Sequence, residues 1–199
     1  MGRISNYQED LVPSLSDKLI GTETNADDAT KNYTISSILE LKQIAASPVL
    51  FATDYTSQAP SVLDVPLQVL FGAAQNIVTD PVMLDVSGNI TFNQAGLYLF
   101  SGYASFERQG SSGGVSVVLF RALINGVQSG ITKSVSLSGT GIAIPYELTT
   151  PIQANAGDVL TWEIMRDSSG VNQGGLYTHT TGSSWSNVPS VSLSIQKLG

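Results

Sequence analysis

The stretch Ile90-Thr91-Phe92-Asn93-Gln94-Ala95-Gly96-Leu97-Tyr98-Leu99-Phe100 decides the fold of this chain. Successive side chains alternate between the two faces of a β-strand, so Ile90 and Phe92 share one face. Gln94-Ala95-Gly96 predicts a tight turn, because glycine accepts the positive φ that such turns often need. The next predicted strand, 97–106, carries large apolar side chains on both faces, and we expect it to be covered on both sides at the centre of the core.

Short strands separated by turn signals continue on either side of this stretch. The predicted central strand has Tyr98, Phe100, Ala104 and Phe106 on one face and Leu97, Leu99, Ser101 and Tyr103 on the other. Asn125-Gly126 predicts a type I′ hairpin between the apolar segments 115–124 and 127–135, and 191–198 predicts a closing strand. Roughly eight to ten short strands at this spacing are typical of an all-β fold, an antiparallel sandwich or jelly roll.

Composition and charge exclude several kinds of partner. The chain has a net charge of −7 at pH 7 and no cysteine. Nucleic acid is disfavoured, because phosphate binding rewards clusters of lysine and arginine. Without cysteine, disulfides, thiolate metal sites and cysteine nucleophiles are excluded. A membrane-spanning helix needs about 20 apolar residues in a row, which no run approaches, so we expect no membrane insertion.

Charged residues concentrate at the start of the chain, where residues 1–46 hold 11 of the 25. The remainder is rich in Ser, Thr, Gly and Val, which favours strands and turns over helices. We predict an extended anchor segment with one short helix over 1–47 and a jelly-roll domain over 48–199. A surface with so few charges is often one that copies of the same chain partly cover.

The segment 1–47 lacks sustained periodicity before residue 30 and then predicts one helix over 31–47. Ser37-Ile38-Leu39-Glu40 has the form of a capping box, and Thr34 is an alternative cap. Neither the short helix nor the apolar residues before it can form a core alone, so they need a partner: the body of the chain, symmetry copies or a host particle. The candidate anchor residues are Leu11, Leu15, Leu19, Ile20, Tyr33, Ile35 and Ile38.

Two motifs in this segment resemble the N-terminal part of many tailed-phage virion proteins. Ser16-Asp17-Lys18-Leu19-Ile20-Gly21-Thr22-Glu23 is similar to their D-K-hydrophobic-G-T/S stretch, and Thr30-Lys31-Asn32-Tyr33-Thr34-Ile35 is similar to the T-K-N-[FY]-T-[IV] motif that follows. In that group, fibre or receptor-binding modules come next. The resemblance implies attachment to a capsid or tail protein and localisation in the virion after synthesis in the host cytoplasm.

The rest of the chain resembles the tumour-necrosis-factor and complement globular-head superfamily. The stretch 90–100 is similar to its F-…-G-x-Y-x-F centre, and Ala156-Gly157-Asp158-Val159-Leu160 is similar to its x-G-D-x-[VIL] turn. The resemblance implies a ten-strand jelly roll that forms a homotrimer, with Tyr98 and Phe100 near the threefold axis. The N-terminal segment stands where that superfamily has a stalk or membrane stem. The candidate residues of the trimer core or interface are Tyr98, Phe100, Leu97, Leu99, Phe120 and Arg121.

Arg121 and Glu107 are the polar residues within the most apolar predicted strands. A lone buried charge costs too much free energy to persist, so Arg121 either pairs across a subunit boundary or lies at a strand edge in water. Both interpretations remain open at the level of the sequence.

The sequence predicts no catalytic residue, metal site or cofactor. His179 is the only histidine, and no G-x-S-x-G nucleophile motif is present. Asp158 is expected to cap a turn, and Glu163 and Asp167 are expected to be solvated. A metal site with several histidines of one chain is excluded, although three copies of His179 could meet on a threefold axis.

The loop that precedes the closing strand contains three candidate ligand contacts, Tyr177, His179 and Trp185. Exposed aromatic side chains beside polar loops often contact glycans or proteins. The alternative for Trp185 is a structural anchor that pins the loop. The leading hypothesis is therefore a non-enzymatic structural protein of the virion, and the second is a receptor-binding module for a host cell-surface glycan.

Overall fold

The computed structural model of the chain describes residues 18–22, 30–34, 48–75, 80–110, 113–182 and 184–198. The chain divides into two units, Met1–Ala45 and Ala46–Gly199. Every helix or strand in the described residues is a β-strand, which confirms the all-β prediction for that part of the chain. None of these residues belongs to a helix with the length and apolar character of a bilayer span.

In the N-terminal unit, the described residues form a two-stranded antiparallel sheet. β1 (Lys18–Thr22) pairs with β2 (Thr30–Thr34), with Lys18 opposite Thr34. The helix predicted over 31–47 is therefore wrong at its start, where Thr and Tyr side chains favour extended backbone. Residues 35–47, including the predicted capping box, lie outside the described residues.

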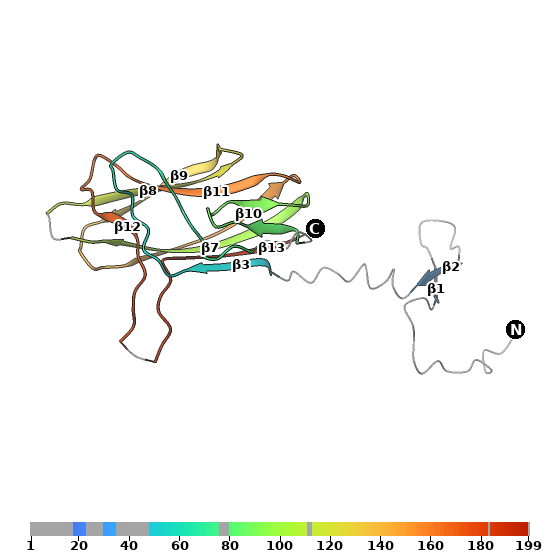
Figure 1. Ribbon diagram of the computed structural model, residues 1–199. Coiled ribbons are helices and arrows are strands. Elements are labelled where there is room, and N and C mark those ends of the chain that lie inside the picture. Colours follow the sequence, from blue (N-terminus) through green and yellow to red (C-terminus); the bar gives the residue numbers. More distant parts are fainter. Residues whose placement is uncertain are drawn as a thin grey trace, which may run out of the picture. The chain divides into compact units, whose positions relative to one another are not determined.

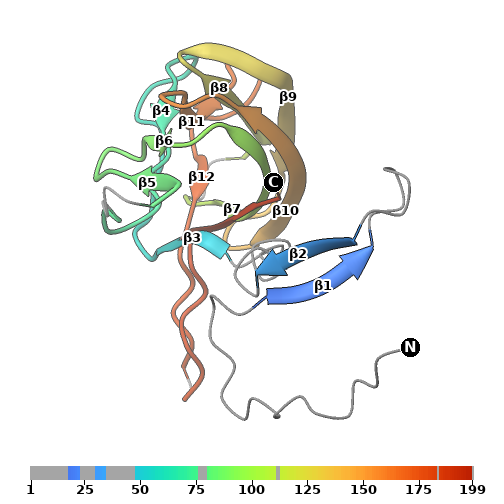
Figure 2. The ribbon, with the colours of Figure 1, turned by 90° about the vertical axis from the view of Figure 1, so that its right-hand side faces the viewer.

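The second unit is an antiparallel β-sandwich (Figures 1 and 2). The first sheet has the strand order β10-β7-β13-β3, with β12 beside β7, and consists of β3 (Pro48–Asp54), β7 (Gly96–Arg108), β10 (Ile144–Ala154), β12 (Gly174–Leu176) and β13 (Val191–Lys197). The second sheet has the order β5-β6-β11-β8-β9, with β4 beside β11, and consists of β4 (Leu67–Gln68), β5 (Val82–Leu84), β6 (Ile90–Phe92), β8 (Ser116–Ile124), β9 (Val127–Leu137) and β11 (Val159–Arg166).

The chain crosses repeatedly from one sheet to the other, so most pairings join distant segments. β7, for example, pairs with β10 on one side and with β13 on the other. The predicted hairpin at Asn125-Gly126 is confirmed, since it joins β8 to β9 with Ile124 opposite Val127. Asn125 and Gly126 have φ values of 52° and 77°, as a type I′ turn requires.

The strand predicted at the centre of the core, 97–106, buries its inner-face side chains Tyr98, Phe100, Ala104 and Phe106. Ile90 and Phe92 of β6 are fully buried, and so is Tyr98 of β7. The Tyr98 ring packs against Phe92 with ring centres 4.8 Å apart, and its hydroxyl donates a 2.7 Å hydrogen bond to the carbonyl oxygen of Gln94. Tyr98 therefore fixes both the core and the turn before its own strand.

The opposite face of β7 is only partly covered within the chain. Leu97 is 39% exposed, and Leu99, Ser101 and Tyr103 are half-buried. The prediction that β7 is covered on both sides therefore holds within one chain only for its last residues, where Ser105 and Glu107 are buried as well as Ala104 and Phe106.

One edge of the sandwich, which we call the closed edge, is sealed by residues 55–75. Gln75 joins the two sheets there, because its backbone pairs with Leu84 of β5 and its side chain donates to the carbonyl oxygen of Phe51 in β3. Val69 and Phe71, each 1% exposed, add two side chains from this segment to the core.

The other edge, which we call the open edge, is formed by β9 and β10. Inward-facing side chains of β10 there, including Tyr146, Leu148 and Ile152, are only half-buried. A cavity of about 420 Å³ lies between the sheets at this edge. The same sandwich is thus sealed by its own chain on one side only.

Candidate functional site

The face of the first sheet that points away from the core carries almost no charge; we call it the outer face. Its accessible positions are Phe51 and Thr53 of β3, Ser192, Ser194 and Gln196 of β13, Leu97, Leu99, Ser101 and Tyr103 of β7, and Pro145, Glu147, Thr149, Pro151 and Gln153 of β10. Among these, only Glu147 is charged. On β7 the same face continues through Ser105 and Glu107, which are buried within the chain. The cores of protein interfaces are likewise poor in charged residues.

Small polar side chains form a row across the middle of the outer face. Ser194 of β13 lies opposite Phe51 of β3 and opposite Ser101 of β7, and Ser101 lies opposite Thr149 of β10. The hydroxyl oxygens of Ser101 and Thr149 are 3.3 Å apart and share a hydrogen bond. Short side chains in this row let a flat surface approach closely, at little cost in desolvated charge.

The predicted core or interface residues lie on two different surfaces. Tyr98, Phe100 and Phe120 point between the sheets and are 0%, 1% and 4% exposed, so they pack within one chain. Leu97 and Leu99 lie on the outer face and remain accessible. Of these five apolar residues, only the two leucines have side chains that a second copy could contact.

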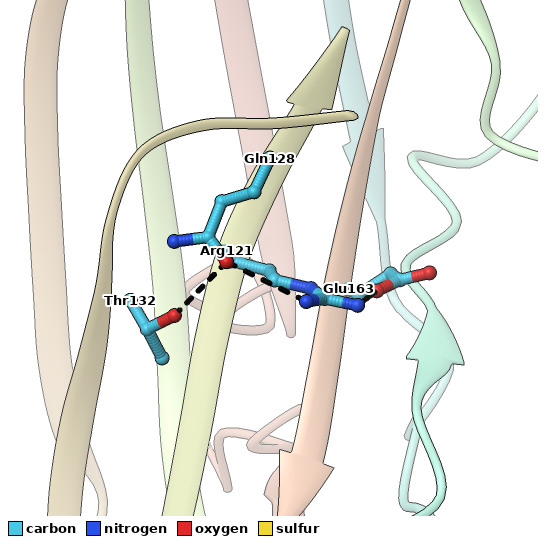
Figure 3. A network of polar contacts seen from close by, with 4 residues as sticks. All are labelled: Arg121, Gln128, Thr132 and Glu163. Carbon is cyan, nitrogen blue, oxygen red and sulfur yellow. Dashed lines mark hydrogen bonds and ion pairs between the residues drawn. The ribbon is translucent and has the colours of Figure 1, made fainter. Parts of the chain in front are cut away.

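Arg121 has its charge partner in its own chain (Figure 3). Glu163 lies opposite Arg121, on β11. The Nε and Nη2 atoms of Arg121 donate hydrogen bonds of 3.0 and 2.9 Å to Oε2 of Glu163. Gln128 and Thr132 of β9 extend the network through the Gln128 side-chain oxygen. The Arg121 and Glu163 side chains are 37% and 24% exposed, so water screens the pair, and it stabilises the fold by at most about 1 kcal/mol.

The segment 177–189 between β12 and β13 projects away from the two sheets (Figures 1 and 2); we call it the projecting hairpin. Tyr177 is half-buried at its base, and His179, which is exposed, pairs through its backbone with Val188. Trp185 lies near the tip and is 80% exposed. The three predicted ligand contacts are thus spread along one arm.

Polar contacts hold the tip of the projecting hairpin in shape. The Thr181 hydroxyl donates a 2.6 Å bond to the carbonyl oxygen of Trp185, and the Thr181 N–H donates to the side-chain oxygen of Asn187. The backbone of Trp185 is therefore fixed while most of its surface faces solvent. This arrangement favours a contact residue over an anchor that pins the loop.

Two aspartates cap turns, as their backbone partners show. Asp158 accepts hydrogen bonds from the backbone N–H of Asn155 and the side chain of Asn125, each at 2.8 Å, and these bonds lower its pKa. Hydrogen bonds from Ser169 lower the pKa of Asp167 in the same way. The predicted turn-capping role of Asp158 is confirmed. Within the described part of the chain, no three His, Asp or Glu residues are grouped to hold a metal ion.

The candidate anchor residues are described only in part. Leu19 and Ile20 lie in β1, and Tyr33 lies in β2 opposite Leu19. Leu11, Leu15, Ile35 and Ile38 lie outside the described residues.

Searches found no protein-family model and no curated protein that matches the chain.

The sequence interpretation missed the row of hydroxyl side chains on the outer face and the cavity at the open edge. The alternation Val191-Ser192-Leu193-Ser194-Ile195 carries a signal for the row, because every second residue is small and polar. The cavity has no comparable signal, since it depends on how β9 and β10 lie across from each other.

Proposed function

We propose that this chain is a homotrimeric structural protein of a tailed-phage particle, a head fibre, decoration protein or short tail fibre. The N-terminal segment would attach to a capsid or tail protein, and the sandwich would project outward. The observation that carries the self-association is the outer face of the first sheet, whose accessible positions include a single charged residue, Glu147. The assignment to a phage particle is supported by the sequence resemblance of Ser16–Glu23 and 30–38 alone.

We further propose that the sandwich is a jelly roll. If β3, β6, β7, β8, β9, β10, β11 and β13 are counted as strands one to eight, the sheets have the orders 1-8-3-6 and 2-7-4-5. This is the order that an eight-strand jelly roll with two Greek keys has. The short strands β4, β5 and β12 add to these sheets without changing the order.

The trimer is tested by light scattering on the purified full-length chain. We expect three times the chain mass of 21.0 kDa. Ser101→Arg places a charge at the centre of the outer face and should yield monomers, because the buried charge would have no partner. Ser134→Arg, at an exposed position of β9 in the other sheet, is the matched control and should remain trimeric. A monomeric wild type would reject the proposal.

Attachment to a particle has its own test. The chain should be detected by mass spectrometry in gradient-purified phage particles from its natural source. Particles assembled with a chain that lacks residues 1–47 should not contain it. Equal amounts of both chains in the particles would show that the N-terminal segment is not the anchor.

The exposure of Trp185 near the tip of the projecting hairpin favours a second function, recognition of a host cell-surface glycan. Aromatic side chains provide large contact areas at low entropic cost. Trp185→Ala should abolish binding to a glycan array or to host cells, whereas Tyr55→Ala, which removes another exposed aromatic residue, should not. In either case we expect no turnover of surface polysaccharide.

A further inference from the structure

The cavity at the open edge has the size and walls of a small-molecule site. Its volume of about 420 Å³ falls within the range of roughly 300–1,000 Å³ that such sites occupy. Inner-face side chains of both sheets line it, among them Phe100, Phe120, Ala122, Leu148, Ile152 and Trp162. An apolar molecule between the sheets would contact aromatic and aliphatic surface on both sides.

The charge of the cavity is opposite to that of the protein. The chain carries a net charge of −7, yet no Asp or Glu lines the cavity, and its ionisable residues are Arg121 and Lys133. Arg121 is bound to Glu163. Lys133 faces inward from β9 with its Nζ 5.4 Å from the centre of the Tyr146 ring, and it forms no ion pair within the described residues. Lys133 is therefore the cation that remains for an anionic ligand.

Trp162 also lines the cavity and packs against two other aromatic rings. Its ring centre lies 5.0 Å from that of Phe100 and 6.3 Å from that of Phe120. Trp162 is 9% exposed, and its Nε1 is the single buried side-chain N or O atom of the described residues that has no hydrogen-bond partner there. A buried donor without an acceptor is destabilising, but this atom has almost no accessible surface and cannot bond a ligand without a local rearrangement.

We propose that the cavity binds a small amphipathic carboxylate, such as a medium-chain fatty acid. The apolar chain packs between the sheets, and the carboxylate is selected by the Lys133 ammonium. The Lys133 ammonium repels cationic amphiphiles, and alcohols are left with a weaker, uncharged interaction. The site lies within one chain and does not require the proposed trimer.

The test uses the full-length chain with the substitution Trp185→Phe. The chain has two tryptophans, so Trp162 is then the one that remains. The protein is titrated with decanoate, decanol or decyltrimethylammonium, each below its micelle concentration. The readouts are Trp162 fluorescence and the NMR signal of its indole N–H. Decanoate should shift that signal with a saturable curve. Lys133→Met should weaken decanoate binding by about tenfold or more, the usual size of a lost charge-assisted hydrogen bond, and leave decanol unchanged.

Two further variants control for indirect effects. Lys197→Met removes a lysine whose Nζ bonds to Gln94 instead of facing the cavity, and decanoate affinity should not change. Ala122→Phe fills the cavity and should abolish binding of decanoate and decanol alike. If Ala122→Phe does not fold, the proposal is decided by whether Lys133→Met weakens the binding of decanoate but not that of decanol.

The proposal is overturned if millimolar decanoate leaves the Trp162 signal unchanged, or if all three head groups bind equally well. Light scattering on the same samples separates this failure from that of the proposed assembly. An unresponsive Trp162 in a trimer would reject the ligand and retain the trimer. An unresponsive Trp162 in a monomer would reject both.

Discussion

The two edges of the sandwich differ in how completely the chain itself covers the side chains between the sheets. At the closed edge, the side chains of Phe71 and Val69 are buried in the core. The Gln58 side chain forms two hydrogen bonds with the backbone of Leu70, each 2.8 Å long: its Nε2 donates to the carbonyl oxygen, and its Oε1 accepts from the N–H. At the open edge, inner side chains such as Leu148 stay half-buried. The difference shows that the chain covers its core at one edge and leaves inner side chains partly exposed at the other.

The open edge also carries features that restrain indiscriminate pairing. β10 contains Pro145 and Pro151, which have no backbone N–H to offer to another strand. Lys133 on β9 points inward, a device that protects edge strands from adding further strands. The open edge is therefore suited to a specific contact through side chains.

The largest effect expected from this comparison is that of Phe71→Ala. Removing a fully buried aromatic side chain at the closed edge should lower the free energy of unfolding by about 3–5 kcal/mol. Urea denaturation followed by circular dichroism measures the loss. A change below about 1 kcal/mol would mean that residues 55–75 do not seal the core.

Gln58→Ala should have the next largest effect. It removes both side-chain partners of the Leu70 backbone and should cost about 1–3 kcal/mol, the usual penalty for buried polar groups left unpaired. Gln128→Ala is the matched control, because the Gln128 contacts are exposed, and it should stay within about 0.5 kcal/mol of the wild type.

Leu148→Ala sharpens the comparison at the open edge. Because Leu148 is half-buried, the loss should be about 1–2 kcal/mol, less than the 2–5 kcal/mol of a fully buried leucine. The free energy of unfolding, measured at several protein concentrations with and without decanoate, tests whether a second copy or a ligand covers the open edge. A full-sized loss that grows with protein concentration would identify a second copy.

Glu163→Gln should change stability by less than about 1 kcal/mol, since the pair with Arg121 is partly solvated. The small loss should shrink further in 1 M salt, where exposed charges are screened. Thermal unfolding at low and high salt measures both values. A loss that salt does not reduce would show that the network in Figure 3 acts through packing instead of charge.

The smallest effect concerns the turns beside the open edge, where Asp158 joins the β8–β9 turn through Asn125. The pKa of Asp158 is lower in the folded chain than its ordinary value of 3.8. Its stabilising contribution is therefore complete above that value and is lost as the pH falls through the lowered pKa. Asp158→Asn should reduce the acid sensitivity of unfolding in this range, which a pH series of denaturation curves detects. An unchanged slope would reject the linkage.

Local sequence patterns account for much of the fold. The alternation of Ile90 and Phe92, the Asn125-Gly126 turn and the capping by Asp158 were predictable, because each depends on residues close together in the chain. The start of the predicted helix failed because β2 pairs with β1, and that pairing adds to the preference of Thr and Tyr for extended backbone.

The sequence alone determined that the chain is built from strands, which stretch lies at the centre, and that its surface is poor in charge. Only the tertiary structure decided that Arg121 pairs with Glu163, that Phe100 packs inside while Leu99 faces out, and that one edge closes while the other leaves a cavity. The physical reason is that side-chain alternation separates the two faces of a strand without fixing what covers each face. That depends on contacts between strands that the chain brings together from distant positions.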